Sequence, residues 1–183
     1  MKKTNIYNMA TCGIMAALLC VLAPFALPIG PVPISLATMV VYLAAYVLGS
    51  KWSVVSVVIY LLLGMVGLPV FSKGQAGVGV LAGPTGGYLI GYIFLALISG
   101  IVISKVNYNL WLTMIGMVAA TAVLYVFGTV WFVIMMDSNV PYALSVCVVP
   151  FIPGDIIKIV GATLLGKALR GALNKANLLP QQS

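Results

Sequence analysis

The sequence predicts an all-α integral membrane bundle of six transmembrane helices, and its composition and hydropathy pattern both indicate this. Of the 183 residues, 63% are hydrophobic and 6% are charged, a balance from which a soluble domain could not build a polar surface. Apolar stretches also recur along the chain, each near the roughly 20 residues that cross a bilayer. We therefore expect residues 1–183 to form one membrane-embedded domain without a removable signal peptide.

Six spans are expected in chain order. The first covers residues 8–27 and ends at a cluster that breaks helices, Pro28, Gly30, Pro31 and Pro33. The second covers 34–48 and, after Gly49, Ser50 and Lys51, the third covers 52–68. The fourth, fifth and sixth cover 84–104, 110–136 and 141–173. Because the sixth contains Pro150, Pro153 and Gly154, we expect a broken helix whose free backbone groups face protein or a cavity.

A glycine-rich outer loop, residues 71–83, is expected between the third and fourth helices. Glycine adopts positive φ angles and lets the backbone approach a ligand closely, so the loop suits a lid or a binding loop. The alternative is a tight turn plus close helix packing, since Gly87 and Gly91 have Gly-x-x-x-Gly spacing. Gln75 and Tyr88 bring polar groups to this apolar region, and we expect them to contact a ligand.

The distribution of charge predicts the orientation. With six spans, seven basic residues fall on the side of the termini: Lys2, Lys3, Lys51, Lys105, Lys167, Arg170 and Lys175. The other side carries Lys73 and Asp137. The positive-inside rule therefore puts both termini in the cytoplasm and residues 71–83 and 137–153 outside, in a multi-pass protein of the cell membrane. The net charge of +7 follows from this topology, so we expect no nucleic-acid partner.

The residues needed for several kinds of chemistry are absent from the sequence. It contains no histidine, and Cys12, Cys20 and Cys147 lack metal-binding or redox spacing. We therefore expect no catalytic residues, no metal and no cofactor, with the cysteines acting as small packing residues. A phosphate-binding loop of the Gly-x-x-x-x-Gly-Lys-Ser/Thr type is also missing. If the protein moves a solute at the expense of ATP, we expect another chain to hydrolyse the ATP.

Asp155 and Lys158 are the ionisable residues expected inside an apolar span, three positions apart and so on one helix face. Each would cost about 2.5–3.5 kcal/mol at the bilayer centre, and intramembrane charges of this kind usually mark a functional site. The alternative is a salt bridge that only neutralises two buried charges. Because Asp155 follows Pro153 and Gly154, we expect it at a helix cap, near backbone N–H groups that favour an anionic solute.

These two side chains suggest a class of ligand. Lys158 could bind a carboxylate, and Asp155 could accept hydrogen bonds from amide or ureido N–H groups. A small amphipathic molecule with an acid at one end and N–H groups at the other would suit both.

Four segments resemble the signature segments of the BioY family, the biotin-specific S components of energy-coupling factor (ECF) transporters. They are Val-Pro-Ile-Ser-Leu at 32–36, Gly-Leu-Pro-Val-Phe at 67–71, Gly-Pro-Thr-Gly-Gly-Tyr-Leu at 83–89 and Pro-Phe-Ile-Pro-Gly-Asp-Ile-Ile-Lys at 150–158. The resemblance implies a biotin site that opens outward between two loops and the last helix. It implies that the substrate-binding residues are Gln75, Gly83, Thr85, Tyr88, Asp155 and Lys158. Gln-Ala-Gly at 75–77 stands where the family is associated with a basic or polar residue before paired glycines, so this segment departs from the family pattern.

The resemblance also implies partners. Gly13 and Ala17 on the first helix have small-x-x-x-small spacing, which suits either packing within the chain or contact with another helix. In the BioY family the corresponding face docks on a transmembrane coupling subunit, which works with two ATPase subunits. The expected function is high-affinity capture of biotin outside the cell and its inward delivery by this complex. Three alternatives remain: an S component for another vitamin, a stand-alone facilitator, and a membrane enzyme acting on lipid.

Overall fold

The computed structural model of the protein describes residues 3–27, 32–176 and 178. Helices make up 79% of the structure, which confirms the all-helical class. In chain order the elements are α1 (Lys3–Leu22), β1 (Ala26–Leu27), β2 (Ile34–Ser35), α2 (Ala37–Met65), the 3-10 helix η1 (Ser72–Gly74), α3 (Val78–Leu81), α4 (Gly86–Lys105), α5 (Leu110–Met136), α6 (Val140–Cys147) and α7 (Ile152–Lys175). Lys2, Pro28, Gly30 and Pro31, which the sequence analysis used, lie outside the described residues.

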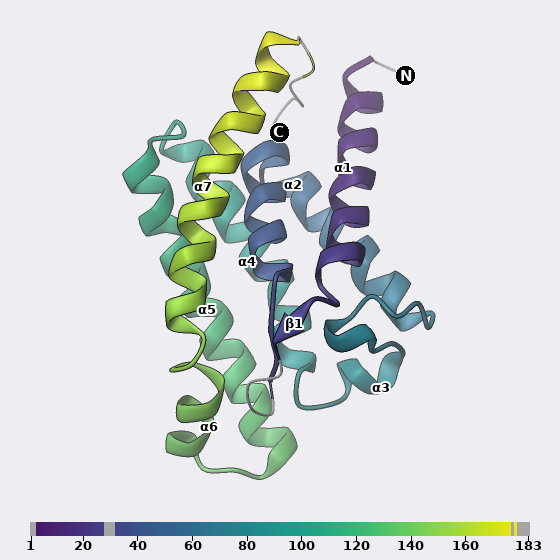
Figure 1. Ribbon diagram of the computed structural model, residues 1–183, viewed down its shortest axis with the longest axis vertical. Helices are drawn as coiled ribbons and strands as arrows, with labels where there is room; N and C mark the ends of the chain where they lie inside the picture. Colours follow the sequence, from purple (N-terminus) through teal and green to yellow (C-terminus); the bar gives the residue numbers. More distant parts are fainter. Residues whose placement is uncertain (1–2, 28–31, 177, 179–183) are drawn as a thin grey trace.

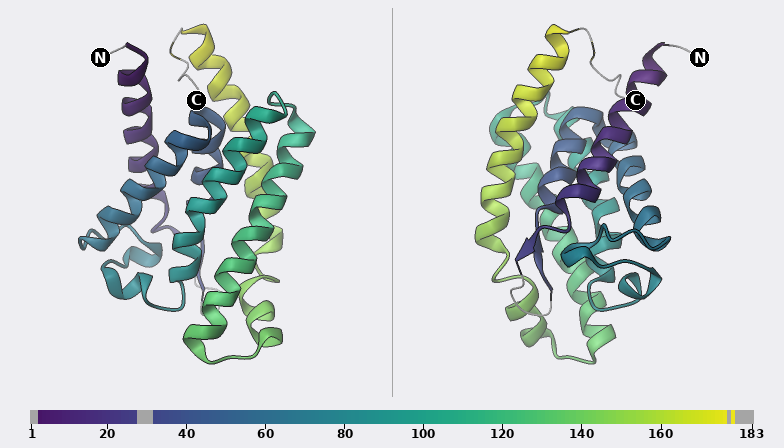
Figure 2. Two further views of the ribbon diagram at one scale, coloured as in Figure 1. Left: turned by 180° about the vertical axis from the view of Figure 1, so that it is seen from behind. Right: turned by 45° about the vertical axis from the view of Figure 1, so that its right-hand side comes forward.

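Helix α2 is bent at Gly49, where the sequence predicts a break between two spans. Gly49 has φ 74° and ψ −170°, a backbone conformation that glycine adopts readily and that interrupts the helix. The half before Gly49 runs toward the end of the molecule where α1 begins and α7 ends, and the second half runs back (Figures 1 and 2). One assigned helix therefore contains two segments that run in different directions.

The molecule has two distinct ends (Figure 1). The start of α1, the bend of α2, the turn between α4 and α5 and the last turns of α7 lie at one end, which we call the terminal end. The loop end carries η1, α3 and α6, with the β1–β2 hairpin between it and the middle of the bundle. Helix α2 packs on α1, α4 and α7, and α4 also packs on α5.

Three helices of the described residues, α2, α4 and α5, are long and apolar enough to cross a membrane. Helices α6 and α7, bent by 46° at the break between them, count as a fourth if they form one span. Helix α1 contains a shorter apolar segment, Ile6–Leu22. These features identify a membrane protein, with three or four helices of the described residues that qualify as spans.

The predicted bounds are wrong at the first two spans. Helix α1 ends at Leu22 and not at residue 27, because Pro24 disfavours helical backbone at the residue before it. Residues 26–27 instead pair with residues 34–35 in an antiparallel two-stranded ribbon, so the second span starts at Ala37. The fifth span agrees with α5, and the predicted break in the sixth falls between α6 and α7.

The loop end has more local structure than a glycine-rich loop predicts. Two short helices, η1 and α3, lie within residues 71–83. Phe71 is fully buried and meets the ring of Tyr60 edge-on, with ring centroids 5.6 Å apart. The backbone N–H of Lys73 donates to the carbonyl oxygen of Pro24 at 3.1 Å. The loop is therefore fastened to α2 and to the segment that follows α1.

Gly87 and Gly91 allow close packing of two helices within the chain. A Cβ atom at Gly87 would overlap the side chain of Trp131, and one at Gly91 would lie 2.5 Å from Cδ1 of Leu124. Both neighbours belong to α5. The Gly-x-x-x-Gly spacing therefore brings α4 against α5, as the packing alternative predicted.

Candidate functional site

The first turns of α7 hold the two charged residues that the sequence singles out. Asp155 and Lys158 are 4% and 8% exposed, and Nζ of Lys158 lies 3.0 Å from Oδ1 of Asp155. The expectation that Asp155 caps the helix is wrong. The helix cap is Phe151, and the backbone N–H of Asp155 donates to the carbonyl oxygen of Phe151 at 2.8 Å. Its carboxylate is therefore engaged by side chains and not by free backbone groups.

The carboxylate of Asp155 connects three helices. Besides Lys158 on its own helix, it accepts a hydrogen bond from the Tyr125 hydroxyl of α5, 2.5 Å from Oδ2. The hydroxyl of Thr38 on α2 lies 3.5 Å from Oδ1. Hydrogen bonds to an ionised group in a medium of low polarity are strong, and they offset part of the cost of burying the charge.

The ammonium group of Lys158 has donors to spare. It carries three N–H groups, and within the described part of the chain Asp155 is its one hydrogen-bond partner. The acceptor oxygen Oδ1 and this donor nitrogen thus stand side by side, 3.0 Å apart. This pair of neighbouring atoms can bind a ligand that presents a hydrogen-bond donor next to an acceptor.

Three neighbouring cavities lead from the loop end to this charged pair. The innermost, about 30 Å³, is lined by Asp155, Lys158, Tyr125 and Thr38, among others. A middle cavity of about 20 Å³ shares Tyr88 and Tyr92 with it. The outermost, about 250 Å³, is linked to the middle one by shared wall residues that include Gln75 and Thr85. Pro33, next to the β1–β2 hairpin, lines all three.

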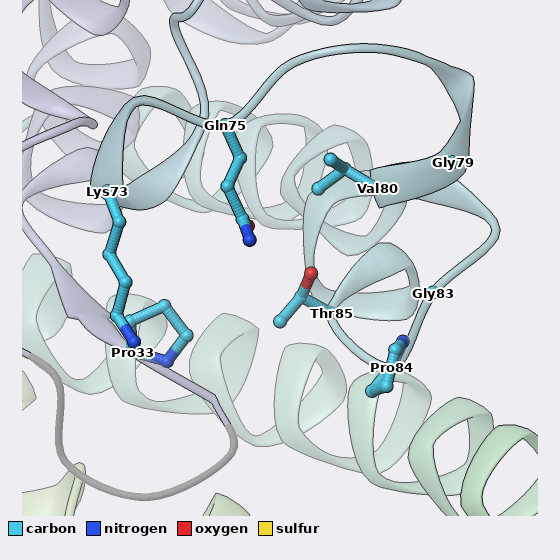
Figure 3. Close-up of a pocket in the computed structure, with 8 residues that line it drawn as sticks. All are labelled: Pro33, Lys73, Gln75, Gly79, Val80, Gly83, Pro84 and Thr85. Carbon is cyan, nitrogen blue, oxygen red and sulfur yellow. The ribbon is translucent and has the colours of Figure 1, made fainter.

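The outer cavity contains three of the predicted site residues, Gln75, Gly83 and Thr85 (Figure 3). The Gln75 amide points into the space, with Lys73 beside it reaching toward Pro33 and Thr85 across from it (Figure 3). The carbonyl oxygen of Gly83 accepts a hydrogen bond from the indole N–H of Trp131 at 3.0 Å. This bond ties the end of the loop to α5.

Tyr88 lines the inner and middle cavities with its side chain. Its hydroxyl donates to the carbonyl oxygen of Cys147 at 3.1 Å and lies 3.2 Å from Oγ1 of Thr129. Its ring lies nearly parallel to that of Phe151, with centroids 6.4 Å apart. The sequence analysis expected Tyr88 to contact a ligand, but its hydroxyl forms hydrogen bonds within the protein.

All six predicted substrate-binding residues line this row of cavities, Tyr88, Asp155 and Lys158 at the inner end and Gln75, Gly83 and Thr85 at the outer end. The sequence analysis missed Thr38 and Tyr125, whose polar groups meet Asp155 across 117 and 30 positions of sequence. It treated Lys73 only as a charge of the outer loop. Tyr125 could have been found from the sequence, because it places a polar hydroxyl inside an apolar span.

Gly13 and Ala17, predicted to dock a partner, lie on α1, and neither lines these cavities. Both are exposed, whereas Cys12, Met15 and Ala16 on the other side of the helix are buried. A Cβ atom at Gly13 would have no atom within 4 Å. This small-residue face is therefore free within the described structure.

The helices and the cavities define the class of protein: a helical membrane protein with a row of internal cavities that ends at a buried charged pair. A model of the BioY family matches residues 1–175, and the chain belongs to this family.

Named relatives and a solved structure agree with the family. The chain is 41% identical over 158 residues to "Biotin transporter BioY" of Thermotoga maritima, which covers 86% of this chain and 92% of the relative. It is 34% identical over 177 residues to "Biotin transporter BioY2" of Lactococcus lactis subsp. cremoris, covering 97% of each. Its fold matches the crystal structure of "the S-component for biotin from an ECF-type ABC transporter" with TM-score 0.87 and 28% identity, over 93% of this chain and 94% of that one.

Proposed function

We propose that this protein is the biotin-binding S component of an ECF-type importer. Family membership, two relatives named as biotin transporters and a close structural match to a biotin S component support this function. The observation that carries it is the row of cavities that ends on the buried Asp155–Lys158 pair. A transporter needs such a solute site, and relatives named as transporters argue against an enzyme acting on lipid.

The charged pair suits the ureido ring of biotin. A ureido group presents an N–H donor next to a carbonyl acceptor, which complements Oδ1 of Asp155 beside Nζ of Lys158 at 3.0 Å. The sequence analysis assigned Lys158 to the carboxylate and Asp155 to the N–H groups. Because the two side chains are adjacent, both would meet the same end of an extended ligand, so we assign both to the ring.

The carboxylate of biotin would then lie in the outer cavity. Lys73 is the charged residue among those that line it, and Gln75 and Thr85 offer further polar groups. An ammonium and an amide are both good donors to a carboxylate. Tyr88 would contribute the face of its ring, because its hydroxyl is bonded to Cys147 and Thr129.

We also propose that the protein lies in the plasma membrane, crosses it six times and has both termini in the cytoplasm. The two oppositely running halves of α2, together with α1, α4, α5 and the α6–α7 pair, make this count possible (Figure 2). Lys51, Lys105 and the basic residues of the last turns of α7 belong to the terminal end, whereas Lys73 and Asp137 belong to the loop end. By the positive-inside rule the loop end faces outward, and biotin enters there.

Transport would require partner chains, namely a transmembrane coupling subunit and two ATPases. The exposed face around Gly13 and Ala17 is suited to helix contact because small residues let backbones approach closely. The sequence has no phosphate-binding loop, so we assign ATP hydrolysis to the partners and no cofactor to this chain. The loop before Pro33 and residues 71–83 would close over bound biotin before the partners turn the site inward.

Two experiments test this function. Calorimetric titration of the purified protein should give saturable heat with biotin and none with thiamin or riboflavin; heat only with another vitamin would support the alternative S component. Uptake of labelled biotin into vesicles should require the coupling subunit, the ATPases and ATP. Uptake by this chain alone would support the stand-alone facilitator.

A further inference from the structure

Tyr125 holds the oxygen of Asp155 that Lys158 does not use. Its hydroxyl lies 2.5 Å from Oδ2, whereas Nζ of Lys158 lies 3.0 Å from Oδ1. The two donors come from different helices, α5 and α7. Together they determine the plane of the carboxylate and leave Lys158 in contact with one oxygen only.

Tyr125 makes the shortest hydrogen bond to the Asp155 carboxylate, compared with those from Lys158 and Thr38. A lateral groove of about 340 Å³ lies between α5 and α7, and both Tyr125 and Asp155 line it. The two residues also line the inner cavity of about 30 Å³. The bond from Tyr125 ties the carboxylate directly to α5. The bond from Thr38 is weaker, because 3.5 Å is at the limit of a hydrogen bond.

We propose that Tyr125 is a positioning residue that sets the selectivity of the site for a ureido edge; this inference rests on the proposed function. Without its hydroxyl, the Asp155 carboxylate turns so that both oxygens face the ammonium of Lys158. Asp155 then no longer presents a free acceptor oxygen to the N–H of the ligand beside the Lys158 ammonium that donates to the ligand C=O. The simpler reading is that Tyr125 only satisfies a buried carboxylate, in which case selectivity would not depend on it.

The test compares two ligands on the Tyr125→Phe variant. The ligands are biotin and a biotin derivative with one ureido nitrogen methylated, and Kd is measured for each by calorimetry in detergent. We expect the variant to bind biotin at least about tenfold more weakly, the range for a hydrogen bond to a charged group. We also expect the ratio of the Kd for the methylated derivative to the Kd for biotin to be severalfold smaller in the variant than in the wild-type protein. A purely structural role would weaken both ligands equally, and an unchanged ratio overturns the proposal.

Two further variants sharpen the result. Tyr42→Phe also removes a buried tyrosine hydroxyl, one that bonds to Thr121 and does not line the inner cavity, so it should keep the wild-type ratio. Thr38→Val should reduce the ratio less than Tyr125→Phe, and a larger reduction would overturn the assignment to Tyr125. If wild-type protein fails to bind biotin, the proposed function fails as well; if it binds biotin and Tyr125→Phe keeps the ratio, this inference alone fails.

Discussion

The hydroxyl of Tyr88 donates a hydrogen bond to the carbonyl oxygen of Cys147 at 3.1 Å, and so joins the first turn of α4 to the last residue of α6. The same hydroxyl lies 3.2 Å from Thr129 of α5. Tyr88 therefore has two separable parts. Its hydroxyl connects helices, and its ring forms a wall of the cavities next to Phe151.

Replacing Tyr88 by phenylalanine should lower stability more than affinity. Loss of the hydroxyl leaves a buried carbonyl oxygen without this donor, which costs about 1 kcal/mol or somewhat more. Thermal unfolding in detergent should therefore shift downward, while the Kd for biotin stays within about threefold of wild type. Tyr88→Ala, which removes the ring as well, should weaken biotin binding by tenfold or more. A large loss of affinity in Tyr88→Phe would instead assign the hydroxyl to the ligand.

Replacing Gly100 by valine should destabilise the bend of α2. A Cβ atom at Gly100 would lie 2.5 Å from Cα of Ser50, which is backbone that cannot move aside. Overpacking of this kind costs about 1–3 kcal/mol, and thermal unfolding should report it. Gly171→Val is the matched control, because a Cβ there meets no atom within 4 Å. Wild-type stability of Gly100→Val would contradict the close contact of α4 with the bend.

Replacing Gly13 by leucine should separate solute binding from assembly. The new side chain points away from the core, so stability and the Kd for biotin should match wild type. Co-purification with the coupling subunit should fall strongly, because a large residue keeps the two helices apart. Ala17→Leu should behave alike, and Gly171→Leu should assemble normally. Normal assembly of both α1 variants would place the docking surface elsewhere.

Replacing Lys73 by methionine should weaken the binding of biotin modestly, and it should not affect a biotin derivative whose carboxylate charge has been removed. Lys73 is exposed, and an exposed ion pair contributes about 0–1 kcal/mol. We expect Kd for biotin to rise up to about fivefold at low salt, with the difference disappearing at high salt. Biotin methyl ester, which has no carboxylate charge, serves as the control and should bind both proteins alike. An equal loss for the ester would remove Lys73 from carboxylate binding.

Hydropathy and helix breakers predict much of this fold from the sequence. Leu110–Met136 is a continuous apolar stretch between polar turns, so both ends of α5 follow from composition. Gly49 before Ser50 and Lys51 marks the bend of α2. The β1–β2 ribbon could not be predicted, because strands of two residues are too short to show an alternating pattern.

The candidate site was predicted only in part. Asp155 and Lys158 stand out because charges inside an apolar span are costly, and their spacing places them on one helix face. Thr38 and Tyr125 reach the same carboxylate from other helices, and one sequence contains no pattern that links positions so far apart. Lys73 resembles any solvated loop charge until the fold of residues 71–83 brings it to the cavity.

The most direct measurement of the central claim is biotin titration of separate Asp155→Asn and Lys158→Met variants, each shown by its thermal unfolding to be folded. Each variant leaves one buried charge or one ligand group without its partner, so we expect Kd to rise by about 30-fold or more, in line with 2 kcal/mol or above for a charged hydrogen bond. Binding of biotin by both variants with wild-type Kd would show that the solute lies elsewhere.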